Sequence, residues 1–320
     1  MADLSVIIPA RNEMFLKETV EDVLKNSELD TEVIVICDGS WPVYPIDDHP
    51  KVTIIYRSES IGQRAACNEG VRISTADYIM KLDAHCALDK GFDRKLIASA
   101  QELGNDVTQI PTQYNLHVFD WVCADCHYRK YQGPTPVECE KCKSQNVSRE
   151  MIWQPRLSRK TQSWRFDEDL HFQYWNDYLN RPEAKQKYID TMSCLGACWF
   201  MSKSRYWELG GMDEENGSWG QMGTELGCKS WLSGGRMVTN TTTWFAHMFR
   251  TQGGDFSFPY PLSNSDVKKA REHSKKLWME NKWPGAIHNL DWLLNKFKPV
   301  PGWHEMPTKG IIYYTDNKLN

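Results

Sequence analysis

The stretch "LDAHCA" at residues 82–87 places an aspartate and a histidine two positions apart, directly after an apolar run. The run "YIMKLD" predicts a strand, and residues i and i+2 of a strand point to the same side, so Asp83 and His85 are expected to face one spot. A carboxylate oxygen and an imidazole nitrogen together suit Mn²⁺ or Mg²⁺, with positions left for phosphate oxygens and water. Taken alone, the pair is more simply interpreted as a hydrogen-bonded polar pair at a strand end.

Four cysteines have the spacing of a second kind of metal site. Cys123, Cys126, Cys139 and Cys142 form two C-x2-C pairs separated by twelve residues. Two such knuckles supply four thiolates to a tetrahedral Zn²⁺ and close a segment too small to have its own core. Because four thiolates leave no open coordination position, we predict a structural zinc ion rather than a catalytic one.

The composition is that of a globular protein. The chain has 320 residues, of which 41% are hydrophobic and 25% charged, enough for one large α/β domain or two smaller ones. It contains no apolar run of about 18 residues, and a strand-like pattern begins at once, so we expect neither a transmembrane segment nor a signal peptide. A cytoplasmic location is therefore expected, in which the ten cysteines are thiols or metal ligands rather than disulfides.

The order of predicted elements indicates the fold class. Valine-rich and isoleucine-rich strands alternate through the first ~110 residues with helices that begin near residues 13, 62 and 92, which is typical of a doubly wound, mostly parallel α/β sheet. Ligands bind such sheets at the carboxyl ends of strands. The polar residues at those ends are Arg11 to Glu13, Asp38, and Asp83 with His85. We predict an α/β half (1–116), a zinc-ribbon insertion (117–162), a second half (163–262) and a C-terminal helical extension (263–320).

Charge is spread unevenly along the chain. Residues 127–165 contain nine Lys or Arg against three Glu, a net charge of +6, whereas the whole chain carries −4. This basic segment also contains Tyr128, Tyr131, Trp153 and Trp164. It is interpreted either as a surface for an anionic macromolecule such as DNA or as a solvated charged loop.

Several motifs together resemble a known family. "SVIIPARNE", "ICDGS", "IGQRAACNEGV" and "LDAHC" occur in the order and spacing of nucleotide-sugar glycosyltransferases with the GT-A fold, broadly family 2. The segments "SWRFDEDLHFQYW", "SCLGACWFMSKSRYWELGGMDE", "SWGQMGTELGCKSWLSGG" and "TWFAHMFR" resemble the catalytic domain of polypeptide N-acetylgalactosaminyltransferases. The resemblance covers about residues 3–255 without the cysteine insertion, and it implies a GT-A fold whose first half binds the nucleotide sugar.

The resemblance also implies roles for individual residues. His247 would be a third metal ligand beside Asp83 and His85, and the metal would stabilise the departing nucleoside diphosphate. Asp38 would lie against uracil or ribose. The other residues expected near the donor are Pro9, Arg11 and Glu13, which would border the nucleotide, and Gly62, Arg64 and Asn68, which would lie on the loop and helix facing it.

One segment departs from the pattern of the relatives. Met222 and Gly223 occupy the positions at which they carry Glu and Asn, and at which inverting family 2 enzymes usually carry Glu and an aspartate base. Without that base, retention of configuration is favoured, because the departing phosphate can accept the acceptor's proton. Glu225 is the alternative base, or else a solvated helix residue. The donor sugar stays open among GalNAc, GlcNAc and glucose types.

The sequence thus predicts a metal-dependent enzyme that moves a sugar from a UDP-sugar to a hydroxyl group. We expect the acceptor to be a macromolecule. The acceptor that we favour is a hydroxymethylated pyrimidine in DNA, with the DNA bound by the basic segment 127–165. A protein serine or threonine is the alternative acceptor. A non-catalytic, nucleic-acid-binding zinc-ribbon protein is the alternative outside enzymes.

Overall fold

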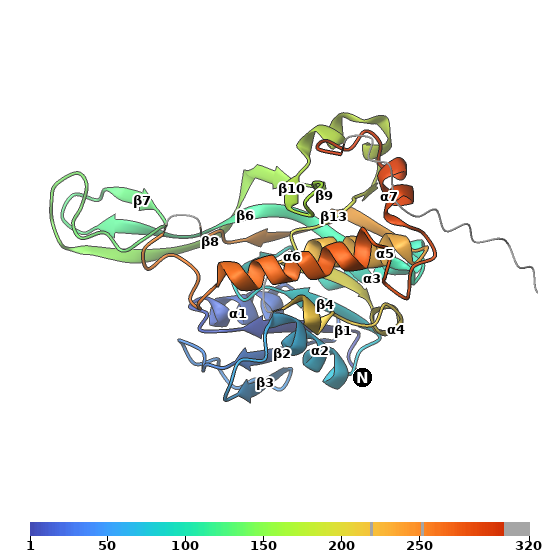
Figure 1. Ribbon diagram of the computed structural model, residues 1–320. Helices are drawn as coiled ribbons and strands as arrows, with labels where there is room; N and C mark the ends of the chain where they lie inside the picture. Colours follow the sequence, from blue (N-terminus) through green and yellow to red (C-terminus); the bar gives the residue numbers. More distant parts are fainter. Residues whose placement is uncertain (218–219, 251–252, 304–320) are drawn as a thin grey trace, which may run out of the picture.

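A large mixed sheet forms the centre of the protein (Figure 1). The computed structural model describes residues 1–217, 220–250 and 253–303, and within them eleven strands join this sheet while two more form a separate ribbon. The strands of the sheet are β1 (Leu4–Ala10), β2 (Thr31–Asp38), β3 (Val52–Arg57), β4 (Tyr78–Leu82), β5 (Cys86–Leu88), β6 (Val107–Cys123), β7 (Arg129–Tyr131), β8 (Val147–Thr161), β11 (Tyr188–Asp190), β12 (Cys198–Ser202) and β13 (Arg236–His247), and those of the ribbon are β9 (Trp164–Phe166) and β10 (Phe172–Tyr174).

Strand directions bring several carboxyl ends to one edge of the sheet. The order is β11-β13-β6-β12-β4-β1-β2-β3, with β5 paired to β13 and both β7 and β8 paired to β6. Strands β4, β1, β2 and β3 are parallel, and β13 is parallel to β6. Because β12 lies antiparallel between β4 and β6, these two neighbours point the same way. Since β13 is parallel to β6, the carboxyl ends of β1, β2, β4 and β13 meet at the edge where α/β sheets bind ligands.

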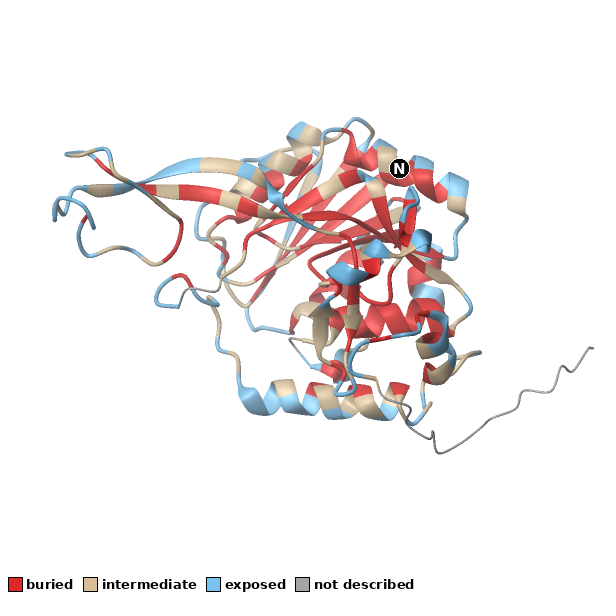
Figure 2. Ribbon diagram, turned by 90° about the horizontal axis from the view of Figure 1, so that it is seen from above, coloured by how far each residue is buried: buried red, intermediate tan, exposed pale blue. Residues whose placement is uncertain are grey.

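Helices cover the sheet, as the alternation of strand and helix patterns predicts. The segments β1 and β2 are almost entirely buried, and Figure 2 shows the buried strands between helices on either side. The GT-A-like α/β class expected from the sequence is thus confirmed. The helices are α1 (Leu16–Asn26), α2 (Gln63–Ile73), α3 (Phe92–Leu103), α4 (Lys203–Glu208), α5 (Met222–Leu232), α6 (Asn264–Trp278) and α7 (Leu290–Lys296), with 3-10 turns η1 (Asn176–Asn180), η2 (Pro182–Ala184) and η3 (Glu214–Asn216).

The segment predicted as a zinc-ribbon insertion forms an arm, residues 117–161, that projects from the body (Figure 1). The arm is continuous with the sheet, because strand β6 extends from the sheet into the arm without interruption. Leu116 and Val118 are both fully buried in one apolar cluster at its base. The returning strand β8 is tied to α1, because Trp153 Nε1 donates to Asp22 Oδ1 over 3.0 Å. The base of the arm is thereby braced while its tip stands in solvent.

Two amphipathic helices follow the second half, as the periodicity predicts. Helix α6 begins after Ser263, whose Oγ accepts a hydrogen bond from the Asp266 N–H, and it buries Ala270, Ser274 and Trp278. Of the predicted extension, residues 304–320 lie outside the described part of the chain. Within the described ranges, every helix is too short or too polar to cross a lipid bilayer.

Candidate active site

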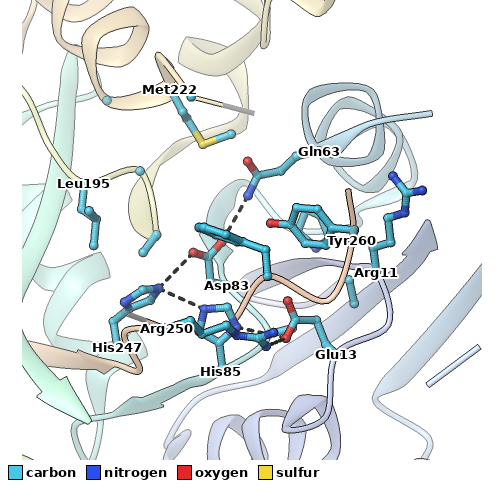
Figure 3. Close-up of a pocket in the computed structure, with 18 of the residues that line it drawn as sticks. Arg11, Glu13, Gln63, Asp83, His85, Leu195, Met222, His247, Arg250 and Tyr260 are labelled. Atoms are coloured by element: carbon cyan, nitrogen blue, oxygen red, sulfur yellow. Dashed lines mark hydrogen bonds and ion pairs between the residues drawn. The ribbon is translucent and has the colours of Figure 1, made fainter. Parts of the chain in front are cut away.

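Three side chains from distant parts of the chain converge at the carboxyl edge of the sheet (Figure 3). Asp83 and His85 lie in the turn between β4 and β5, so strand alternation is not the reason that both face the same spot. His247 ends β13 and pairs with Cys86 of β5, which brings it beside that turn. The fold therefore assembles the three ligands expected from the resemblance.

The spacing of the ligand atoms fits a divalent ion. His85 Nε2 lies 3.1 Å from His247 Nε2, and His247 Nε2 lies 3.3 Å from Asp83 Oδ2. Neighbouring ligands of an octahedral ion with bonds near 2.1 Å are about 3 Å apart. Two nitrogens and one carboxylate oxygen on one side of an ion leave positions for other ligands, so this cluster can hold Mn²⁺ or Mg²⁺ in an open site.

Glu13 orients one of the two imidazoles. Its Oε2 lies 3.2 Å from His85 Nδ1 and also pairs with the Arg250 guanidinium. When the Nδ1–H donates to this carboxylate, the lone pair of His85 Nε2 faces His247, an assignment that follows from the hydrogen-bond network. Burial opposes ionisation of Glu13, but the contact with the His85 ring and the Arg250 charge hold its pKa below the ordinary value. Burial lowers the pKa of His247 to about 4, which leaves a neutral ring able to bind a metal.

Lys81 and Gln63 hold the ligand carboxylate in place. The fully buried Lys81 ammonium donates to Asp83 Oδ1 and, over 2.9 Å, to the carbonyl oxygen of Gly196. Gln63 Nε2 donates to the same Oδ1 over 3.2 Å, so Oδ2 is the oxygen that faces His247. Burial alone would raise the pKa of Asp83, but the adjacent Lys81 charge and the two imidazoles keep it below its ordinary range. The carboxylate is thus ionised and fixed before any ligand arrives.

The three ligands open into a cavity of about 340 Å³ whose two ends differ in character. Figure 3 shows Arg11 and Tyr260 on one side of Asp83, with Leu195 and Met222 on the other. The Arg11 guanidinium lies 5.9 Å from the centroid of the Tyr260 ring. One end therefore offers a cation and an aromatic ring, whereas the other is largely apolar.

Several residues expected near the donor do line this cavity. Pro9, Arg11, Glu13, Asp38 and Gly62 are among its lining residues. The Asp38 carboxylate is already engaged, because it accepts from Ser60 Oγ (2.7 Å), the Ile61 N–H (2.6 Å) and the Gly62 N–H (3.0 Å). Its role includes shaping the loop before α2, which Gly62 enters with a φ of +87° that favours glycine.

Glu225 does not line the cavity, and the structure corrects the expectation that it could act as a base. Its side chain is fully buried in an ion cluster, with Oε2 2.8 Å from Arg64 Nε and Oε1 2.8 Å from Lys229 Nζ. Arg64 also donates to the carbonyl oxygens of Gly217 (2.9 Å) and Gly220 (2.6 Å). Glu225 and Arg64 therefore stabilise chain segments next to the cavity wall, and they do not contact a substrate.

Asn68 is likewise structural. Its Nδ2 donates to the Met212 carbonyl over 2.9 Å and to Glu214 Oε1 over 2.7 Å. Its Oδ1 accepts from Tyr206 Oη over 2.5 Å. Asn68 is absent from the cavity lining, as is Arg64, so the start of α2 contributes Gly62 and Gln63 to the lining instead.

The four arm cysteines form the second candidate metal centre. Their sulfurs all lie within 4.8 Å of one another, and the pairs Cys123–Cys142 and Cys126–Cys139 are each 3.6 Å apart. The edge of a tetrahedron with 2.3 Å zinc–sulfur bonds is about 3.8 Å. Hydrogen bonding from the Cys142 backbone lowers the pKa of the Cys139 thiol to about 7, whereas contacts among the crowded sulfurs raise the pKa values of Cys126 and Cys142, so the geometry is what supports the site. The cluster fits a closed zinc site.

Sequence reasoning missed part of the site. The lysine within the apolar run "YIMKLD" was a usable signal, because a lysine buried in a strand needs an anionic partner. Other lining residues that were missed come from loops or from the first residues of short elements, where no local signature marks them, and they include Gln63, Phe172, Leu195, Arg250, Phe258 and Tyr260.

Comparisons with known proteins agree with this geometry. The model of the family described as "Glycosyl transferase family 2" matches residues 5–138. A Drosophila melanogaster protein named as a polypeptide N-acetylgalactosaminyltransferase 13 is 24% identical over 92% of this chain and 50% of its own length. Human polypeptide N-acetylgalactosaminyltransferase 3 is 24% identical over 86% of this chain and 41% of its own length. The chain thus spans about half the length of these relatives or less.

A solved structure shares the architecture. The crystal structure of GalNAc-T7 with UDP, GalNAc and Mn²⁺ superposes with a TM-score of 0.64 at 15% identity, and the match covers 93% of this chain and 57% of that one. Such a likeness establishes the fold. The chain therefore has the GT-A fold of glycosyltransferases, and its residues 5–138 are similar to the family 2 glycosyltransferase model.

Proposed function

We propose that the protein is a metal-dependent glycosyltransferase that moves a sugar from a UDP-sugar to a hydroxyl group of a macromolecular acceptor. The observation that carries this proposal is the convergence of Asp83, His85 and His247 on one cavity at the carboxyl edge of the sheet. These residues would hold Mn²⁺ or Mg²⁺, which when bound supplies Lewis-acid stabilisation of the departing diphosphate. GalNAc-T7, the structural neighbour, was crystallised with UDP, GalNAc and Mn²⁺.

The cavity supports a retaining reaction. Its acidic lining residues are Glu13, Asp38 and Asp83. Glu13 contacts an imidazole, Asp38 accepts hydrogen bonds from the loop before α2, and Asp83 pairs with a lysine. Within the described lining, a free carboxylate that could deprotonate the acceptor is therefore lacking near Met222. In a retaining transfer on one face of the sugar, the departing phosphate accepts that proton instead.

For the acceptor we propose a hydroxymethylated pyrimidine in DNA, because the surface charge of the basic segment is retained in the fold. All three glutamates of residues 127–165 pair with cations of the same segment: Glu138 with Lys143, Glu140 with Lys130 and Glu150 with Arg129. The arm cations left without an ion pair among the described residues are Lys141, Arg149, Arg156, Arg159 and Lys160, whereas the unpaired Arg165 has its Nε and Nη1 buried. A polyanion is the partner that such a surface attracts.

A protein serine or threonine is the second candidate acceptor, favoured by the names of the relatives. Both candidates can be tested together. The protein is incubated with Mn²⁺, a panel of UDP-sugars, and hydroxymethylcytosine DNA, unmodified DNA or Ser/Thr peptides, and mass gain is measured. A gain on hydroxymethylated DNA supports the proposal, whereas labelling of peptides alone would reject the DNA acceptor.

The same assay separates an enzyme from a binding protein. Slow Mn²⁺-dependent hydrolysis of a UDP-sugar that disappears in Asp83→Ala is the result expected of an enzyme. DNA binding without any turnover of UDP-sugars would instead support a non-catalytic zinc-ribbon protein. The anomeric configuration of the product, read by NMR, decides between retention and inversion.

A further inference from the structure

We propose that Phe172 and Tyr174 of β10 form a platform on which the acceptor nucleobase stacks at the mouth of the donor cavity. The inference rests on the proposed DNA acceptor and adds the residues that would position its base. Phe172 lines the cavity, and the Tyr174 side chain is 46% exposed beside it. Their ring centroids are 5.1 Å apart with planes at 80°, so an aromatic surface leads from the cavity to solvent.

Strand pairing relates the platform to the third metal ligand, His247. Gln113 of β6 lies close enough to the Tyr174 phenol to offset part of the rise that burial causes in its pKa. Two residues further along β6, Asn115 pairs with His247 of β13. Residues i and i+2 of a strand share a face, and so do directly paired residues of neighbouring strands. Tyr174 is therefore linked to the face that carries the third metal ligand.

The arm continues this face with cations and aromatic rings. Asn115 also pairs with Arg156 of β8. The Arg156 guanidinium lies 4.5 Å from the centroid of the Tyr131 ring, and the His117 ring lies 4.7 Å from the same ring. Within the described chain, Arg156 has no ion pair with a carboxylate, so its charge remains available to a phosphate. A strand whose base rests on Tyr174 would therefore have an unpaired cation on the adjoining part of β8.

Ring stacking next to phosphate-binding cations is how proteins hold single-stranded nucleic acid. A base in a duplex must leave the stack before an enzyme can reach its substituents, and an exposed aromatic ring replaces the lost stacking. Removal of one such ring weakens nucleic-acid binding by roughly five- to a hundredfold. A flexible peptide acceptor would depend far less on Tyr174, because most of its side chains offer no flat ring.

The test uses a single-stranded oligonucleotide with one 5-hydroxymethylcytosine and three variants of the full chain. Tyr174→Ala removes the platform ring, Tyr174→Phe retains it, and Tyr44→Ala is the matched control, since Tyr44 is 48% exposed and outside the cavity lining. We expect Tyr174→Ala to raise the KM for the oligonucleotide roughly tenfold or more while UDP-sugar hydrolysis stays within about twofold of wild type. Tyr174→Phe and Tyr44→Ala should both resemble wild type.

The outcomes separate the platform from the proposed acceptor. If wild type glycosylates the oligonucleotide and Tyr174→Ala does so with unchanged KM, the platform is wrong and the DNA acceptor stands. If wild type labels peptides and no DNA, the acceptor is wrong and the platform falls with it. Equal losses in Tyr174→Ala and Tyr174→Phe would assign the effect to the hydroxyl group and its contact with Gln113, which also overturns stacking.

Discussion

The two candidate metal centres of this protein are built in opposite ways. The arm cluster draws its four thiols from positions at most 19 residues apart, and these thiols would surround an ion from all sides. The cavity cluster takes three ligands from the turn after β4 and from β13, with His85 and His247 162 positions apart. The first needs only a short loop. The second exists only when the whole sheet is assembled.

This difference indicates which of the two centres can bind and activate a substrate. Four thiolates satisfy a tetrahedral ion, so the arm site has no position for a substrate. Two imidazoles and one carboxylate oxygen leave positions that face a cavity. The cavity ligands also have supporting partners, Glu13 for His85 and Lys81 for Asp83, and such partners tune a metal that must exchange ligands.

Loss of a cavity ligand should have the largest effect on turnover. In Asp83→Asn we expect Mn²⁺-dependent UDP-sugar hydrolysis to fall roughly a thousandfold, because the ion's stabilisation of the leaving group amounts to several kcal/mol. Initial rates and calorimetric titration with Mn²⁺ measure this. The control is Asp47→Asn, which alters an exposed carboxylate beside Lys17 and should change neither. A rate within tenfold of wild type would remove Asp83 from the metal site.

Disruption of the buried ion cluster around Glu225 should lower the stability of the fold. Glu225→Gln leaves Arg64 and Lys229 without their buried counter-charge, which should lower the free energy of unfolding by about 3–5 kcal/mol. Urea denaturation followed by tryptophan fluorescence measures it. Glu102→Gln, at an exposed pair with Lys187, should leave the denaturation midpoint unchanged. If Glu225→Gln were as stable as wild type but inactive, a catalytic role for this residue would have to be reconsidered.

The partner of His85 should have a smaller effect on the cavity metal. Glu13→Gln keeps the size of the side chain but removes the charge that orients the ring, and we expect Mn²⁺ affinity to fall roughly 10- to 100-fold. Excess Mn²⁺ should restore most of the hydrolysis rate. Glu21→Gln, on the exposed side of α1, serves as the control. Unchanged Mn²⁺ affinity would show that Glu13 serves the nucleotide rather than the histidine.

Removal of the arm metal should affect donor turnover least. Cys139→Ser should abolish the one equivalent of zinc that remains after dialysis against EDTA, as measured by elemental analysis. Because the arm is braced at its base by Trp153 and Asp22, we expect UDP-sugar hydrolysis to stay within about twofold of wild type while transfer to DNA is lost. Parallel loss of both activities would contradict the separation of the two centres.

Sequence reasoning succeeded where the chemistry is local or the pattern extends over many residues. The strand and helix order, the C-x2-C pairs and the Asp83–His85 spacing could all be read directly, although the last pair lies in a turn rather than in a strand. It failed for Glu225, because helical position does not reveal that Arg64, 161 positions earlier, fills the space next to its carboxylate. It expected Glu13 to border the nucleotide, and the fold places this residue in the cavity lining, but the sequence did not reveal its contact with His85.

The sequence by itself determined the α/β class, the thiol cluster and the local metal-ligand pair, because backbone periodicity and short-range spacing are written in consecutive residues. The resemblance named His247 as a third ligand, but only the tertiary structure brought it against Asp83 and His85. Only the tertiary structure decided that Lys81 fixes one oxygen of Asp83 and that Glu225 is enclosed. These contacts depend on strand pairing and on the direction of each side chain after the sheet has formed. The physical reason is that the burial of a side chain and the identity of its partners depend on the surfaces packed around it, so they cannot be read from the residue type alone.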